Sequence, residues 1–138
     1  MKKSISALVM AAALGFLAGC ATQDAGPYAP RIAGVNNLED NAKFVLLDKK
    51  AYDSVTCQSM QETRYPDGRL QVVANLRNLQ NQRIQMQVNC VFKDAQGFSV
   101  EDTPWETVFL DENAQEGIKF VSANDRALRY TIRVRTPR

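Results

Sequence analysis

The sequence predicts an all-β domain, an antiparallel β-sandwich of the immunoglobulin-like kind. Three observations lead to this prediction. Short segments of alternating apolar and polar residues recur along most of the chain, as in half-buried strands. Turn-forming residues separate these segments. Beyond the first nineteen residues, no run of about a dozen residues has the 3.6-residue period of an amphipathic helix. About six to eight short strands within about 100 residues are typical of two packed sheets.

The first predicted strands are separated by two turns. The apolar run FVLL at 44–47 has β character, and a charged turn over 48–50 follows it. Alternation resumes at Val55 and continues to Met60. The segment YPDGR at 65–69 predicts a strong turn, because Pro presets one backbone angle and Gly accepts a positive φ.

The two clearest strands follow this turn, over 70–77 and 84–93. The polar residues 78–82 between them predict a hairpin loop. The apolar residues expected to face the core are Leu70, Val72, Ala74, Leu76, Ile84, Met86, Val88, Cys90 and Phe92. The opposite face of the second strand is expected to meet solvent, and it carries Arg83, Gln85, Gln87, Asn89 and Lys93.

The remaining strands are shorter. The turn DAQG at 94–97 has Gly in the fourth position, which type I turns prefer. Extended residues over 98–109 follow, within which Pro104 predicts a break or an edge. An acidic loop is expected over 111–117, then a strand over 118–122. The last strand is expected to turn its arginines outward and Tyr130, Ile132 and Val134 inward.

The first nineteen residues predict a secretory signal. A basic start at Lys2 and Lys3 precedes an apolar run over 5–17, shorter than the roughly 20 residues of a membrane-spanning helix. The segment ends in Leu17, Ala18, Gly19 and Cys20, which resemble the lipobox of bacterial lipoproteins. That resemblance implies cleavage after Gly19 and a covalent lipid on Cys20. An ordinary secretory signal that happens to end in a cysteine is the alternative.

Residues 20–42 are expected to form the lipidated N-terminus and a flexible tether, and residues 43–138 the β-sandwich domain. The segment is rich in Ala, Gly, Pro, Asn and acidic residues, and Pro27 and Pro30 interrupt any regular period. A first edge strand over 31–35 would end the tether.

Composition narrows the classes of partner. Lys2 and Lys3 are the only charged residues in 1–19, so cleavage removes two of 17 basic residues and none of 15 acidic ones. The remaining 119 residues suit one domain and carry no net charge. No overall field therefore favours nucleic acid as a partner.

Two cysteines remain once the lipid has taken Cys20. Cys57 and Cys90 form an even pair in an exported chain, which is compatible with a disulfide. Such a bridge would close a loop of about 34 residues and contribute about 3–4 kcal/mol. Two thiols that act as small hydrophobic residues are the alternative.

The sequence predicts neither catalysis nor a metal site nor a cofactor beyond the lipid on Cys20. It contains no histidine, which removes the commonest general base and metal ligand. Neighbouring acids such as Glu101 and Asp102 point to opposite faces of a strand, so they are expected to be solvated charges. The glycines stand singly, without the pattern of a phosphate-binding loop.

Three features are candidates for binding. Arg129, Arg133 and Arg135 share one face of the last strand, where they can meet phosphate, lipid head groups or an acidic partner. The simpler interpretation is a charged face that protects an edge strand from aggregation. Trp105 can anchor an interaction, but we expect it to fill the core. The amide-rich segment 80–87, grouped with Asn75, Asn78 and Asn89, can bind sugar or peptide, or can simply be an uncharged solvent face.

Several of these segments together resemble a known family. They are the strand over 84–92, the turn over 93–97, Trp105 and the ending ALRYTIRV at 127–134. With the lipobox, they resemble the YcfL-like family of small periplasmic lipoproteins over roughly residues 35–135. The resemblance implies an immunoglobulin-like sandwich anchored in the envelope, without catalytic residues. It also associates the chain, through the genomic setting of family members, with activator lipoproteins of penicillin-binding proteins.

The expected function is therefore that of a non-enzymatic lipoprotein. Ala21, directly after the lipidated cysteine, resembles the sorting signal for the outer membrane, so the periplasmic face of that membrane is the expected location. The expected partners are the membrane, through the lipid, and an envelope protein complex; a small-molecule ligand is not expected. The alternative is a glycan- or lipid-binding module that uses the arginines or the amide-rich segment.

Overall fold

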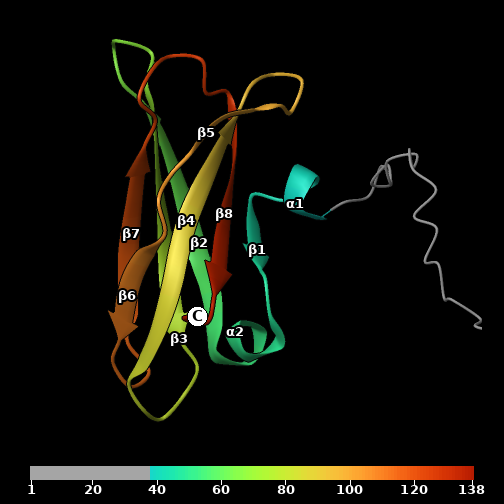
Figure 1. Cartoon of the computed structure of the whole chain (residues 1–138). Coiled ribbons are helices and arrows are strands. Elements are labelled where there is room, and N and C mark those ends of the chain that lie inside the picture. The colour runs from blue at the N-terminus through green and yellow to red at the C-terminus, as the bar shows by residue number, and fades with distance from the viewer. Residues whose placement is uncertain (1–37) are drawn as a thin grey trace, which may run out of the picture. The chain divides into compact units, whose positions relative to one another are not determined.

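The computed structural model describes residues 38–138. The predicted signal, Cys20 and the predicted edge strand at 31–35 lie outside the described residues. Figure 1 shows the order of the elements along the chain. They are α1 (Leu38–Asn41), β1 (Phe44–Leu46), α2 (Lys49–Ser54), β2 (Val55–Arg64), β3 (Leu70–Asn78), β4 (Ile84–Lys93), β5 (Ser99–Asp102), β6 (Glu106–Leu110), β7 (Gln115–Val121) and β8 (Arg129–Arg135).

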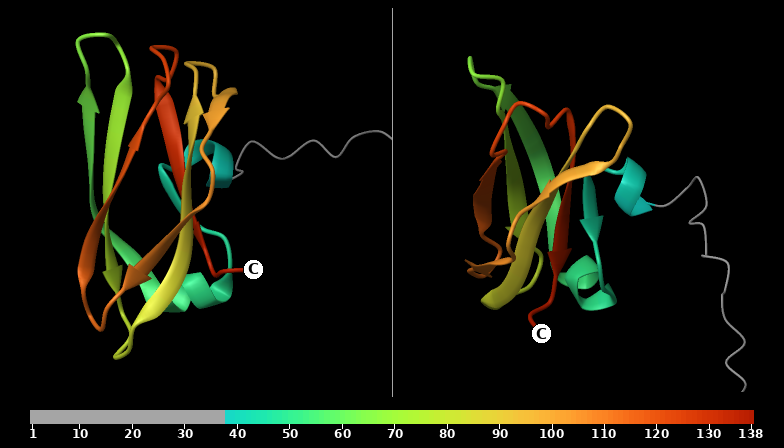
Figure 2. Two further views of the ribbon diagram at one scale, coloured as in Figure 1. Left: turned by 60° about the vertical axis from the view of Figure 1, so that its left-hand side comes forward. Right: turned by 45° about the horizontal axis from the view of Figure 1, so that its top comes forward.

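The strands form two sheets that pack face to face, which confirms the predicted all-β sandwich (Figure 2). Five strands make one sheet in the order β1-β8-β4, with β5 and β6 paired to the free side of β4 one after the other. The other sheet has the order β2-β3-β7. All pairs are antiparallel except β1 with β8, which run parallel. These two strands come from opposite ends of the domain, so no hairpin sets their relative direction.

The core lies between the two sheets and contains the predicted inward faces. The inward residues of β3, β4, β7 and β8 are buried there. Among the core side chains that are less than 2% exposed, the largest apolar ones are Phe92, Leu76, Met86, Leu110 and Ile132. Because a strand turns successive side chains to opposite faces, local alternation was enough to identify all of these except Leu110, which was not predicted.

The segment between β3 and β4 does not form the predicted hairpin. β3 belongs to the three-stranded sheet and β4 to the five-stranded sheet, so the chain crosses from one sheet to the other. Asn78, at the end of β3, is fully buried and bonds to backbone atoms in two loops. A polar loop sequence cannot distinguish a hairpin from such a crossing, because both need the same turn chemistry.

The outer face of β4 is the predicted solvent face only at its start, where Gln85 is exposed and Gln87 is half-buried. Asn89 is 1% exposed and Lys93 is 5% exposed, although both point away from the core. Asn89 donates to the carbonyl of Thr103, after β5, and the ammonium of Lys93 donates to the carbonyl of Glu39 in α1 at 2.6 Å. Segments distant in the sequence therefore cover this face.

Two short helices occupy segments that the sequence analysis assigned to a turn and to the tether. Lys49–Ser54 forms α2 where the charged turn was predicted. Asp48 caps it, because its carboxylate accepts a hydrogen bond from the backbone N–H of Ala51 at 2.8 Å. The same carboxylate accepts from the N–H and hydroxyl of Thr136, at 2.8 and 3.0 Å. Asp48 thus joins α2 to the segment after β8.

Replacing Asp48 is expected to reveal a pH-dependent contribution to stability. Partial burial raises the pKa of Asp48, but hydrogen bonds from the N–H groups of Thr136 and Ala51 outweigh it, so the pKa lies below its ordinary value. The stabilisation is therefore complete above the unfolded pKa near 4 and is lost as the pH falls through the folded pKa. Asp48→Ala should cost about 1–2 kcal/mol at pH 7 in urea unfolding. Asp48→Asn, which retains an acceptor, should cost less, and its deficit should shrink below about pH 4. A deficit that does not change with pH would contradict the assignment.

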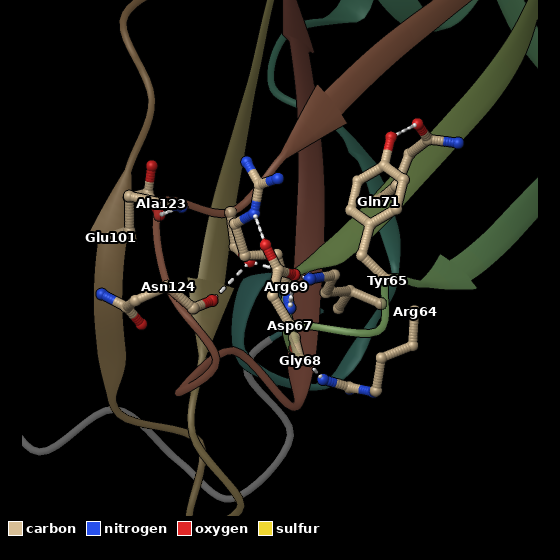
Figure 3. Close-up of polar contacts among 11 residues, drawn as sticks. Arg64, Tyr65, Asp67, Gly68, Arg69, Gln71, Glu101, Ala123 and Asn124 are labelled. Atoms are coloured by element: carbon tan, nitrogen blue, oxygen red, sulfur yellow. Dashed lines mark hydrogen bonds and ion pairs between the residues drawn. The ribbon is translucent and has the colours of Figure 1, made fainter.

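Two turns and one break agree with the sequence predictions. The N–H of Gly68 bonds to the carbonyl of Tyr65, and Gly68 has φ +89°. Figure 3 shows this turn between β2 and β3, where Arg69 contacts Asp67 at 2.7 Å. Gly97 also has φ +89°, in the turn after β4. Residues 103–105, which include Pro104, separate β5 from β6.

Candidate functional site

The three predicted arginines lie in β8 and point away from the core. Arg129, Arg133 and Arg135 alternate with the buried Tyr130 and Ile132, which confirms that the arginines share one face. This is the outer face of the five-stranded sheet. The three side chains have different neighbours on this face.

Trp105 lies on this outer face, so the expectation that it fills the core is wrong. Its side chain is half-buried and is not part of the hydrophobic core cluster. The guanidinium carbon of Arg135 lies 3.8 Å from the centre of the Trp105 ring, and that of Arg133 lies 5.2 Å away. Thr107, two residues later, pairs with Gln87 on the same outer face. We call Trp105, Arg133 and Arg135 the arginine–tryptophan face.

Arg133 is the anchored member of this face. Its Nε donates to the side-chain oxygen of Asn89 at 2.9 Å, and one terminal nitrogen lies 3.0 Å from each carboxylate oxygen of Asp102. Asn89 also donates to Asp102 at 2.6 Å. The Arg133 side chain is only 20% exposed, so Asp102 neutralises its charge where little solvent reaches it.

Arg135 is held in place but is not neutralised. Its Nε donates to the side-chain oxygen of Gln87 at 2.9 Å, and its guanidinium stacks on Trp105. Within residues 38–138, no carboxylate forms an ion pair with it. An ordered guanidinium beside an aromatic ring is suited to accept a carboxylate, because the terminal nitrogens match its two oxygens.

Arg129 does not join Arg133 and Arg135. It is exposed at the other end of β8, near the turn after β4, where a hollow of about 330 Å³ also contains Gln96 and Phe98. Phe98 is 72% exposed. The structure thus unites two of the predicted arginines with the predicted tryptophan and leaves the third apart.

The polar residues that position this face were not predicted from the sequence. Gln87 and Asn89 were expected to be solvated, and Asp102 was expected to be a solvated charge, yet they orient the two arginines. One signal was available, since Asn is rare within strands and position 89 lies in the middle of β4.

A second polar hollow, of about 530 Å³, lies beside the start of β4 and the end of α2. Its polar lining includes Lys50, Ser54, Gln82, Arg83, Gln85 and Thr136. Part of the amide-rich segment 80–87 therefore does line a concave surface. Asn78 and Asn89, which were grouped with this segment, are buried elsewhere and support loops or Arg133.

A third hollow, of about 260 Å³, lies where β2 faces the segment before β1 and the start of β8. Glu62 accepts hydrogen bonds there from Lys43 and from the hydroxyl of Tyr130. These bonds hold the pKa of Glu62 below its ordinary value. Burial, together with the bond to Glu62, raises the pKa of Tyr130 well above its ordinary value. Glu62 and Tyr130 therefore satisfy each other's need for a hydrogen-bond partner.

Cys57 and Cys90 are free thiols in the structure. This agrees with the alternative to a disulfide, in which the two thiols stay separate. Cys90 is fully buried in the core, and burial raises its pKa to about 12. Cys57 is partly buried on β2, and its thiol donates to the carbonyl of Ser59 at 3.4 Å. Burial also raises the pKa of Cys57. Both therefore stay protonated near neutral pH and act as small apolar residues.

The described part of the chain lacks both a metal-binding cluster and a membrane-spanning helix. No group of three or more His, Cys, Asp or Glu residues in 38–138 is arranged to hold a metal ion. No helix in this range is long and apolar enough to cross a membrane.

Comparisons with known proteins identify the family. Residues 43–136 match the family described as "Protein of unknown function (DUF1425)". No curated protein matches the chain. The crystal structure of Campylobacter jejuni cj0090 is similar, with a TM-score of 0.56 and 13% identity over 69% of this chain and 98% of that one. A DUF1425 family member from Shewanella sp. pv-4 has a TM-score of 0.56 and 21% identity over 61% of this chain and 79% of that one.

Both solved structures support the fold alone, because their sequences are so distant from this one. The family match is more specific, since it extends over most of the chain and nearly all of the sandwich. This chain is therefore a member of the DUF1425 family.

Proposed function

We propose that this protein is a non-enzymatic periplasmic lipoprotein, anchored to the outer membrane through Cys20, that docks a protein of an envelope complex. Within DUF1425 we place it with the YcfL-like small periplasmic lipoproteins. The docking surface is the arginine–tryptophan face, and the occupant is an acidic segment of the partner protein. The lipobox residues Leu17–Cys20 support the anchor.

The state of Arg135 is the observation that carries this proposal. Arg133 has a carboxylate partner, whereas Arg135, held by Gln87 and Trp105, has none among the described residues. A carboxylate of another protein supplies the missing charge. Tryptophan and arginine are also the residue types that contribute most binding energy at protein interfaces.

Anchoring makes a small docking surface effective. A lipid on Cys20 would confine the protein and its membrane-bound partners to the same layer, which raises their effective concentration. A contact built around one arginine and one tryptophan is then sufficient for a transient complex in the envelope.

The proposal can be tested by site-specific crosslinking in intact cells. A photo-crosslinking amino acid replaces Thr107, which is exposed on β6 beside the arginine–tryptophan face, or Lys119, which is exposed on β7. We expect a discrete protein adduct from position 107 only. Arg135→Glu should reduce its yield at least about tenfold, because a repulsion replaces one charge-assisted hydrogen bond. Arg77→Glu, on the exposed surface of β3, is the matched control and should leave the yield unchanged.

The protein identified by the adduct can then be purified and titrated into the full chain. Trp105 is the only tryptophan, so its fluorescence reports on this face alone. A saturable change that weakens with added salt is expected. Equal adducts from both positions, an adduct that persists in the Arg135→Glu variant, or no adduct at all would refute the proposed docking surface.

A further inference from the structure

The hollow beside the start of β4 has features of a ligand site that the docking function does not use. Its volume of about 530 Å³ falls within the range of pockets that bind small molecules. Its walls come from three separate segments: the helix α2, the β3–β4 connection with the start of β4, and the segment after β8.

Ser54 contributes a hydroxyl to this hollow. The residue is only 6% exposed, and its carbonyl accepts a hydrogen bond from the N–H of Leu79. Its hydroxyl forms no hydrogen bond with any residue in 38–138, and the side chain lines the hollow. No buried side-chain polar atom among the described residues lacks a hydrogen-bond partner, so this hydroxyl is open to solvent in the hollow, where a ligand can bond to it.

The charges around the hollow are positive. Lys50 has no ion pair within the described residues. Arg83 lies 3.4 Å from Asp111, but both side chains are more than 60% exposed, so this ion pair is weak. The guanidinium of Arg83 also stacks on Phe109, 4.9 Å from the ring centre, which restricts its orientation. No acidic side chain lines the hollow.

The other polar groups can recognise hydroxyls. Gln82 and Gln85 present side-chain amides that both donate and accept, and neither is engaged in a side-chain hydrogen bond within 38–138. Amides that offer both functions beside a hydroxyl suit a ring that carries several hydroxyl groups. Ile84 and Pro137 add apolar surface against which such a ring can lie.

We infer that this hollow binds an acidic saccharide, meaning a hydroxylated sugar ring that carries a carboxylate or a phosphate. The anion lies between Lys50 and Arg83, and the ring hydroxyls bond to Ser54, Gln82 and Gln85. The inference does not depend on the arginine–tryptophan face, because the two surfaces use different side chains.

Amide NMR spectra of the full chain in detergent micelles can test this inference. The probes are glucuronate and glucose 6-phosphate, with glucose, acetate and inorganic phosphate for comparison. We expect saturable shifts at residues 50–54, 82–85 and 136 with one or both acidic sugars, and at least about tenfold weaker binding of glucose. Lys50→Gln and Arg83→Gln should each weaken binding about tenfold, the size of one charge-assisted contact. Lys119→Gln, on β7, is the matched control.

Each outcome bears on the inference. A response to glucuronate alone or to glucose 6-phosphate alone supports it and identifies the anion. Binding of acetate or inorganic phosphate as tight as that of the acidic sugars would refute a saccharide site. Absence of shifts, shifts elsewhere, or binding unchanged in both variants would refute the site itself. Urea unfolding of each variant, with an unchanged midpoint, excludes loss of folding as the cause.

Discussion

Replacing Asn78 by Asp is expected to destabilise the domain by about 3–5 kcal/mol at pH 7, although the two side chains have the same shape. The Asn78 side-chain nitrogen donates to three backbone carbonyls, those of Gln82, Leu110 and Asp111, at 2.8, 3.1 and 2.8 Å. Its oxygen accepts from the N–H of Gln80 at 2.8 Å. A carboxylate would place a buried negative charge against these three carbonyl oxygens.

The effect of this substitution should depend on pH in a known direction. Burial and the facing carbonyls raise the pKa of the new carboxyl in the N78D variant above its unfolded value. Protonation restores one donor, so the deficit relative to the native chain should shrink as the pH falls toward 4. Asn78→Ala removes both donor and acceptor and should cost about 2–4 kcal/mol without this pH dependence.

Urea unfolding measures both variants, as a lower midpoint with an unchanged slope. Asn75→Asp is the control, because Asn75 lies on the same strand and is partly exposed. It should cost less than about 1 kcal/mol. An N78D variant as stable as the N75D variant would show that Asn78 does not hold the two loops together.

The second large effect is expected at Gly68 and is best measured against Gly97. Both glycines have φ +89°, a backbone conformation that costs other residues about 1–3 kcal/mol. They differ in their surroundings. A Cβ added at Gly68 would lie 2.7 Å from the Cβ of Asp125, whereas one added at Gly97 would meet only the end of the Arg129 side chain, at 3.4 Å.

Gly68→Ala should therefore cost clearly more than Gly97→Ala, by about 1–3 kcal/mol of overpacking beyond the shared backbone term. The turn cannot easily move aside, because Arg64 donates to the carbonyl of Gly68 at 2.8 Å and Asp67 bonds to Arg69 (Figure 3). Thermal or urea unfolding of both variants gives the difference directly. Equal losses of stability in the two variants would mean that the loop carrying Asp125 moves aside at no cost in free energy.

The outcome at Trp105 shows why the candidate site was only partly predictable. A tryptophan next to a proline edge is compatible with a core position, and that was the expectation. The face of the sheet on which Trp105 lies depends on the pairing of β6 with β4, which places Thr107 opposite Gln87 on the outer face. That register is set by contacts between separate strands, so the local sequence around residue 105 does not indicate it.

The residues that support Arg133 could not be predicted for the same reason. Asn89 in a strand and Asp102 beside Glu101 suggest solvent-exposed positions when each is taken with its neighbours. Asn89 is in fact buried, while Asp102 stays exposed, and the two support Arg133 together only because β8 lies next to β4 and brings Arg133 to them. Likewise Lys50, Ser54 and Gln85 line one hollow although about 30 residues separate the first two from the third.

From the amino-acid order alone came the strand segments, the inward faces, the two glycine turns and the outward direction of the β8 arginines. Each of these follows from a period of two residues or from the backbone preferences of Pro and Gly, which act over a few neighbouring residues. Tertiary structure alone decided the crossing after β3, the parallel pairing of β1, the position of Trp105 and the burial of Asn89 and Asn78. Those features depend on which strands become neighbours, and that choice is made by packing between segments far apart in the chain.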